Sequence, residues 1–469
     1  MFKKHKFKFI FIIVMYCIAS VFIHLNNYSS ISIFNPPKQL SNPTSIVETL
    51  AVSGSTGSSL KVLTTTDAAF GIQDITIGVP SSDTNPIAIL LHDDVNLSYL
   101  ITHLADNGYL TISIDISSTF INNTTSIDSA LLNTLFTNQI KNIVEEVDNP
   151  ASELYNKAEF SEVSLFGIGT GGLGAYYLTI SPPDTSLLNL SSTLLVAPNL
   201  SSLQDKTTTP DTPIGIILPQ YDGLVRSLDG QMLFDLWAFS DELTAPISCV
   251  YLLNANHNYF SDVYDFDDSL NVPYSTDNPN RLIQSDQQKF LTNYTLDFFE
   301  YYNSGNNITN IGLDTGVIAP NTMYGLDVLT SLSTPDSLPI ISAVGTISES
   351  FNELGGTNNM NNASISYITE SYIASYDEAY GFQHPGLPEN LGLLKFSWTV
   401  DTGTLTTTIP AQYKDFSGYS SLSFWIALDV ANNLNSLEYQ SIIISLKDSS
   451  GNIEHVLLDE NSVALTMRK

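Results

Sequence analysis

The chain of 469 residues is strongly acidic, with 48 Asp and Glu residues against 17 Lys and Arg residues and a formal net charge of −31. A negative field of this size repels nucleic acid and anionic membrane surfaces, so nucleic acid is excluded as a partner. Hydrophobic residues form 43% of the chain, which excludes a disordered protein and is sufficient for two or three domains with full cores.

The first 25 residues have the three-part layout of a secretory signal. Residues 1–8 are basic, residues 9–23 are almost continuously apolar, and polar residues follow. A small-residue cleavage site is present near Ala19 or Ser20, while the apolar stretch would also serve as an uncleaved anchor. We therefore expect a secreted or envelope-associated protein, which contacts a membrane only through this segment and only if the segment is not cleaved.

Residues 26–58 are rich in Ser, Pro and Asn and indicate a linker. Residues 59–303 then alternate between short apolar runs and stretches with helical spacing. Strands are predicted at 86–91, 109–114, 163–166, 193–197, 214–218 and 247–253, and helices at 99–107, 127–147, 171–180, 230–239 and 284–302. This alternation predicts an α/β domain with a mostly parallel sheet, helices on both faces and a ligand site beyond the carboxyl ends of the strands.

The pattern of apolar and polar residues changes after residue 303. Residues 304–345 are expected to form a linker, and residues 346–469 an all-β, jelly-roll-like sandwich with a hairpin turn at 448–451. Its alternating strands are predicted at 394–398, 404–409, 422–427, 441–446 and 455–458. A sandwich that ends so soon after a strand would expose an edge, so we expect this domain to be truncated at its C-terminus.

A glycine-rich turn lies between a predicted strand and a predicted helix. Residues 167–171 have the sequence Gly-Ile-Gly-Thr-Gly, where serine hydrolases place their nucleophile elbow, and Gly169 stands at the nucleophile position. Downstream, Asp222 directly follows a predicted strand and His257 follows the next one. The order of elbow, acid and base is that of the hydrolase triad.

These motifs carry a family resemblance. The segments LLHDD, LFGIGTGGLGA, LPQYDGLVRSLDGQ and NANHNYF are similar to those of secreted α/β hydrolases of the lipase and polyesterase-like type. The resemblance spans residues 60–302 and continues from residue 347 into an appended galactose-binding-like β-sandwich. It implies an α/β-hydrolase fold followed by that sandwich.

The resemblance also implies a role for each motif residue. Asp222 takes the acid position, His257 the base position and Gly169 the nucleophile position, while Asp93 replaces a glycine in the oxyanion-hole loop. Gly169 has no hydroxyl, and a carboxylate at Asp93 opposes the negative charge that an oxyanion hole stabilises. Thr170, also in the oxyanion-hole region, is the alternative source of a hydroxyl, although its side chain is expected to point into the packing between sheet and helix.

Three functions remain open on this basis. The first is a pseudoenzyme with a degenerate serine-hydrolase site and a binding or surface role. The second is an active carboxylic-ester hydrolase that uses an unrecognised nucleophile with Asp222 and His257. The third is a glycan-binding envelope protein, and the expected ligand is accordingly an ester or a glycan.

Two further motifs suggest cofactors. Gly167, Gly169 and Gly172 satisfy the dinucleotide fingerprint, but at least two strands precede them and the next strand ends without an acid, so no nucleotide cofactor is expected. The acidic run at residues 262–268 has the hard oxygen ligands of a calcium site, or it is a solvated lid loop, which we favour because the spacing of an EF-hand is missing. No metal is expected.

Aromatic residues in the C-terminal region have two interpretations. Exposed aromatics bind glycans in appended β-domains of this kind, whereas aromatics within strands pack into the core. The favoured interpretation is core packing, and the residues concerned are Trp398, Trp425 and Tyr413.

Overall fold

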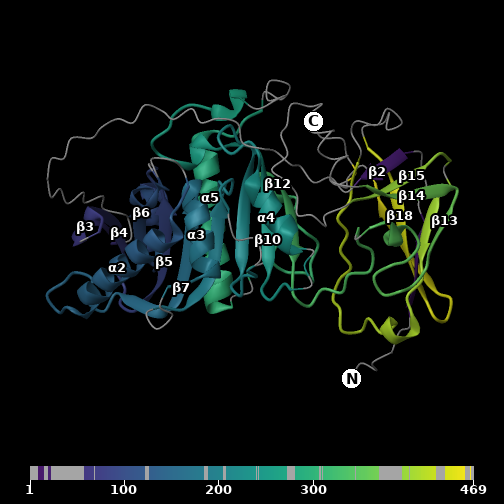
Figure 1. The fold of residues 1–469 in the computed structure, drawn as a ribbon, viewed down its shortest axis with the longest axis horizontal. Coiled ribbons are helices and arrows are strands. Elements are labelled where there is room, and N and C mark those ends of the chain that lie inside the picture. Colours follow the sequence, from purple (N-terminus) through teal and green to yellow (C-terminus); the bar gives the residue numbers. More distant parts are fainter. Residues whose placement is uncertain are drawn as a thin grey trace. The chain divides into compact units, whose positions relative to one another are not determined.

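The computed structural model describes most of the chain outside its N-terminal region. The described residues are 9–14, 19–22, 57–67, 69–93, 95–121, 126–183, 188–203, 208–238, 240, 242–271, 280–305, 308, 310–343, 345–368, 393–400, 402–428, 439–459 and 465. The chain divides into two compact units (Figure 1). One comprises Tyr28–Asp314 and Ala319–Pro335, and the other comprises Met1–Asn27, Thr315–Ile318 and Asp336–Lys469.

A ten-stranded sheet forms the centre of the first unit, in the order β11-β12-β10-β9-β8-β7-β5-β6-β4-β3. Strands β6, β5, β7, β8, β9 and β10 run parallel, and the outer strands pair antiparallel. The strands are β3 (Ser59–Asp67), β4 (Gly71–Val79), β5 (Asn85–His92), β6 (Leu110–Asp115), β7 (Ala158–Ile168), β8 (Leu190–Val196), β9 (Ile214–Tyr221), β10 (Ile247–Asn256), β11 (Thr322–Met323) and β12 (Leu326–Ser333). The central strands carry runs of buried apolar residues because both of their faces are covered, and residues 87–91 of β5 are all 0% exposed.

Helices cover both faces of this sheet. They are α1 (Ser98–Asp106), α2 (Ser129–Asp148), α3 (Thr170–Ile180), α4 (Asp229–Ala238) and α5 (Gln284–Ser304). On β9, Gly215 faces Phe298 of α5, whereas the next residue, Ile216, contacts Gly230 of α4. Because successive residues of a strand point to opposite faces, α5 and α4 lie on opposite sides of the sheet.

The predicted α/β unit with a mostly parallel sheet is thus confirmed. The sequence did not indicate the hairpin of β3 and β4, in which exposed polar residues such as Thr64 and Asp74 interrupt the apolar pattern and burial is concentrated in the second half of β4. Residues 304–345, expected to be a linker, contain β12, which pairs antiparallel with β10. Only Val328 and Ser333 of this strand are buried, which explains why its sequence lacks the apolar run of the inner strands.

The second unit contains two separate antiparallel sheets, ordered β13-β16-β1-β18-β19 and β14-β15-β2-β17. Their strands are β1 (Phe9–Val14), β2 (Ala19–Phe22), β13 (Asn358–Asn361), β14 (Ala363–Ile368), β15 (Leu393–Trp398), β16 (Thr404–Thr407), β17 (Ala427–Leu428), β18 (Ile442–Asp448) and β19 (Ile453–Leu458). The predicted hairpin turn at 448–451 joins β18 to β19. The strand predicted at 422–427 is reduced to β17, because residues 422–424 are exposed and unpaired in the sheet.

Strands β1 and β2 come from the segment that the sequence indicates as a signal or anchor. Its cleavage or retention stays a prediction. Among the described residues, no helix combines the length and hydrophobicity needed to span a membrane.

Candidate functional site

The glycine turn between β7 and α3 has a backbone shape that favours glycine. Gly169 adopts φ +56° and ψ −124°. Its N–H donates to the carbonyl of Val196 (3.1 Å), and its carbonyl accepts from the N–H of Asn199 (2.9 Å). These bonds fix the turn against the end of β8, so any other residue at this position would have to adopt the same strained conformation.

The neighbouring glycines serve close packing. A Cβ atom on Gly167 would lie 2.4 Å from the carbonyl oxygen of Gly171, and one on Gly171 would lie 2.1 Å from the carbonyl oxygen of Leu91. A Cβ atom on Gly172 would meet the side chain of Pro198 at 2.7 Å. Contact between α3 and the strand ends therefore accounts for the glycine spacing without a nucleotide.

Asp222 and His257 form a buried acid–base pair at the carboxyl ends of β9 and β10. Nδ1 of His257 lies 3.1 Å from both carboxylate oxygens of Asp222. Asp222 also accepts hydrogen bonds from the N–H groups of Leu224 (3.0 Å) and Val225 (2.6 Å). Only 2% of Asp222 and 5% of His257 are exposed, so the pair is shielded from water and held in one orientation.

The other ring nitrogen of His257 is directed at the glycine turn. A Cβ atom built on Gly169 would lie 3.8 Å from Nε2 of His257 and 3.7 Å from Oδ1 of Asp93. Asp93 is half-buried and follows β5. The structure therefore brings together four residues that the sequence singled out separately, namely Gly169, Asp222, His257 and Asp93.

A fifth residue, Asp268, joins the two loops that carry the pair. Its Oδ2 accepts from the N–H of Gly223 (2.7 Å) and its Oδ1 from the N–H of Asn258 (3.0 Å). Gly223 and Asn258 directly follow Asp222 and His257, so Asp268 fixes the spacing of the acid and base loops. The sequence marks Asp268 only as a member of the acidic run at residues 262–268. Its separation along the chain from Asp222 and His257 does not indicate this role.

The carboxylates around His257 determine its charge. Burial lowers the pKa of His257, but the charge and hydrogen bond of Asp222, with smaller contributions from Asp268 and Asp93, raise it to about 9. Burial raises the pKa of Asp268 to about 6, and the charge of Asp222 adds to this, while His257 and the two N–H donors oppose it. At neutral pH the imidazole is therefore a cation among carboxylates.

We expect His257 to titrate near pH 9 rather than near its usual pKa of 6.5. Because the folded-state pKa is raised, this group contributes stability that is complete below about pH 6.5 and is lost as pH rises through about 9. Histidine Cε1–H signals measured by NMR check this, with His257→Gln to assign the resonance. Asp222→Asn should lower the midpoint, and a midpoint at or below 6.5 in the parent would contradict the arrangement.

Thr170 begins α3 and is only 4% exposed. Among the described residues, no hydrogen bond joins its hydroxyl to His257. Its N–H group lies in the first turn of the helix, where no intrahelical acceptor exists. Thr170 therefore offers a backbone donor beside Gly169 but not a hydroxyl coupled to the base.

The remaining predicted sites lie apart from this group. Within the described ranges, no cluster of His, Cys, Asp and Glu could hold a metal ion, the described part of the acidic run included. In the second unit, Trp398 is buried in the core at 2% exposure, Trp425 is half-buried and Tyr413 is 39% exposed. Core packing thus explains Trp398 but not Tyr413.

No protein-family model and no curated protein matches this sequence. The chemistry of the site follows from its own side chains. Asp222 orients His257, and His257 faces Gly169. Gly169 has the N–H group of Thr170 and the carboxylate of Asp93 nearby but supplies no hydroxyl itself.

Proposed function

We propose that the first unit is an α/β-hydrolase fold whose serine-hydrolase site is degenerate, and that this site binds a ligand without hydrolysing it. The support for the fold is positional. Gly169 follows β7, Asp222 follows β9 and His257 follows β10, which is the chain order of nucleophile, acid and base in that fold. Asp93 follows β5, where the fold carries its oxyanion-hole loop.

The absent hydroxyl is the observation that carries the proposal of lost catalysis. His257 is oriented by Asp222 and faces the place where a side chain on Gly169 would begin, yet glycine supplies no atom to be activated. Asp93 adds a negative charge to the same space, which opposes a developing oxyanion. Both substitutions act against acyl transfer.

Ester turnover by the purified chain tests the proposal. We expect no hydrolysis of short-chain nitrophenyl esters above the buffer rate and no labelling by a fluorophosphonate probe, which reacts with activated hydroxyls. Turnover that disappears in His257→Ala would overturn it.

An active ester hydrolase is the second candidate, and one observation favours it. The Asp222–His257 pair retains hydrogen-bonding geometry and is further fixed by Asp268. A general base held in this way could activate a nucleophile other than a side chain at residue 169. Hydrolysis without fluorophosphonate labelling, lost in His257→Ala, would favour this candidate.

The second unit and the cellular location of the protein complete the proposed function. We propose that its two antiparallel sheets form a galactose-binding-like sandwich and that the protein acts outside the cytoplasm. Exposed Tyr413 supports a glycan contact on this unit.

A further inference from the structure

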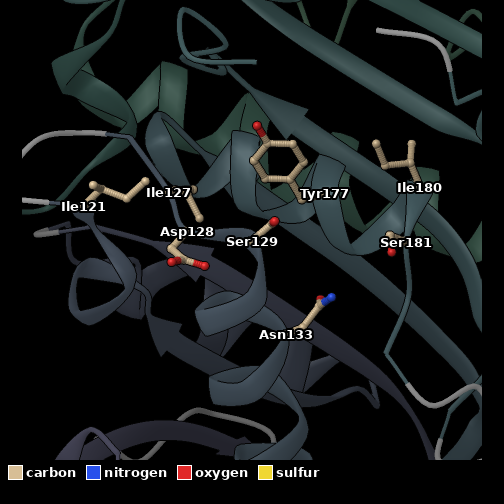
Figure 2. Close-up of a pocket in the computed structure, with 8 residues that line it drawn as sticks. All are labelled: Ile121, Ile127, Asp128, Ser129, Asn133, Tyr177, Ile180 and Ser181. Atoms are coloured by element: carbon tan, nitrogen blue, oxygen red, sulfur yellow. The ribbon is translucent and has the colours of Figure 1, made fainter. Parts of the chain in front are cut away.

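A cavity of about 430 Å³ lies between the start of α2 and the end of α3 (Figure 2). It belongs to the first unit and shares no residue with the group around Gly169. Gly169 precedes the first residue of α3, whereas Tyr177 lies eight residues later, which corresponds to about 12 Å along the helix. The volume is within the range of pockets that hold small ligands.

One polar atom in the cavity lacks a partner. Oδ1 of Asn133 is buried and, within the described part of the chain, accepts no hydrogen bond. Figure 2 shows the Asn133 amide pointing from α2 toward the end of α3. A buried acceptor without a donor is unfavourable by about 1–3 kcal/mol, so a ligand that donates a hydrogen bond here would relieve this cost.

Hydroxyl groups and apolar surface surround this acceptor. Ser129 and Ser181 are both exposed and bring hydroxyls that can donate or accept. Buried Ile127 and Tyr177, together with half-buried Ile180, provide the apolar part of the lining. The cavity therefore fits a ligand with several hydroxyls and an apolar C–H face.

The charges at the cavity favour a neutral ligand. Asp128 is the lining residue with a formal charge, and its Oδ1 caps α2 by accepting from the N–H groups of Ala130 (3.0 Å) and Leu131 (3.1 Å). The carboxylate repels an anion, whereas the positive end of the α2 dipole and the two N–H donors offset part of its attraction for a cation. An anion is therefore disfavoured, and a cation gains little over a neutral ligand.

We propose that this cavity is a second ligand site, specific for a neutral polyhydroxylated ring of monosaccharide size that donates a hydroxyl to Asn133 and packs its C–H face on Ile127 and Tyr177. Such a ligand is a free sugar or one terminal sugar unit of a glycan. The proposal does not depend on hydrolase activity, because no residue of the Gly169 group takes part.

Saturation-transfer NMR on the full chain tests the site directly. The probes are methyl glycosides of glucose, galactose and mannose, with hexanol, hexylamine and hexanoate as comparators. We expect saturation of at least one glycoside, strongest at the protons of one ring face, and no competition by hexylamine or hexanoate.

Variants locate the binding. Asn133→Ala should raise Kd about five- to tenfold, as expected for one lost hydrogen bond. Ser129→Trp, at an exposed first-turn position, should fill the cavity and abolish binding. Thr134→Ala is the matched control, because Thr134 is the next residue on α2 and is exposed. Among the described residues its hydroxyl bonds only to the carbonyl of Ala130 (2.8 Å), so its loss should leave Kd unchanged.

Three results would overturn the proposal. The first is the absence of saturation for every glycoside, and the second is saturation of hexanol alone. The third is glycoside binding that persists unchanged in both Asn133→Ala and Ser129→Trp, which would place the sugar elsewhere on the chain. The cavity shares no residue with the group around Gly169, so Gly169→Ser should not alter glycoside binding. A negative result for glycoside binding therefore does not bear on the proposed hydrolase-type site, and a negative result at that site does not bear on glycoside binding.

Discussion

The Gly169→Ser protein is expected to hydrolyse short-chain nitrophenyl esters at least about 100-fold faster than the parent, because general-base assistance contributes about 10²–10⁴ in rate. A Cβ atom at this position lies 3.8 Å from Nε2 of His257, so a serine hydroxyl one bond further out comes within hydrogen-bonding reach of the base. Initial rates of nitrophenol release measure the effect.

The pH profile of this variant follows from the charge of His257. Only the neutral imidazole accepts a proton from serine, and its pKa is raised to about 9. Activity should therefore rise with pH through a midpoint near 9 and level off roughly one pH unit above it. A midpoint near 6.5 would show that the carboxylates around His257 do not hold its proton as the structure implies.

Gly169→Ala is the matched control, since it imposes the same strain at φ +56° without a hydroxyl. Both substitutions should lower the free energy of unfolding by about 1–3 kcal/mol. Only Gly169→Ser should gain activity, and adding His257→Gln should remove the gain. Equal rates for the serine and alanine variants would refute the proposed geometry.

Asp93 is expected to limit the ester-hydrolysis rate that Gly169→Ser gains. Its Oδ1 lies 3.7 Å from the point that a Cβ atom of residue 169 would occupy, where it opposes an oxyanion. Combining Gly169→Ser with Asp93→Gly should therefore raise the rate by a further factor of about 10 or more, whereas Asp93→Gly alone should stay inactive. A double variant no faster than Gly169→Ser would show that Asp93 does not impede the chemistry.

The sequence was sufficient to place the acid, the base and the glycine turn. Each follows a strand predicted from a short apolar run, and parallel strands bring their carboxyl ends to one edge of a sheet. Asp222, His257 and Gly169 therefore meet for a reason that is visible in the sequence pattern. Asp93 could be placed at the same edge by the same reasoning, because it follows β5.

Other parts of the site depend on contacts that no local pattern encodes. Asp268 ties two loops together through the N–H groups of Gly223 and Asn258, and neither its residue type nor its spacing marks it among its acidic neighbours. The cavity beside Asn133 arises from the way α2 meets the end of α3. Strand β12 lies second from the edge of the sheet and is half-exposed, so the apolar run that marks a buried strand is missing.

Replacement of Gly171 by alanine is expected to produce a large loss of stability, about 3 kcal/mol or more, or to prevent folding of the first unit. A Cβ atom there would lie 2.1 Å from the carbonyl oxygen and 2.5 Å from the carbonyl carbon of Leu91. Both atoms are backbone of β5, so no rotamer change relieves the overlap, and α3 must move off the sheet. Urea unfolding of the full chain measures the change in free energy.

Gly305→Ala separates this steric effect from the general cost of replacing a glycine. Gly305 ends α5 at φ +63°, and a Cβ atom there would meet no atom within 4 Å. Alanine should therefore cost only about 1 kcal/mol, from the left-handed backbone alone. Equal losses of unfolding free energy for Gly171→Ala and Gly305→Ala would mean that α3 does not pack closely on β5.

A displacement of α3 would also affect the site. Because α3 starts at the glycine turn, its movement would shift Gly169 away from His257.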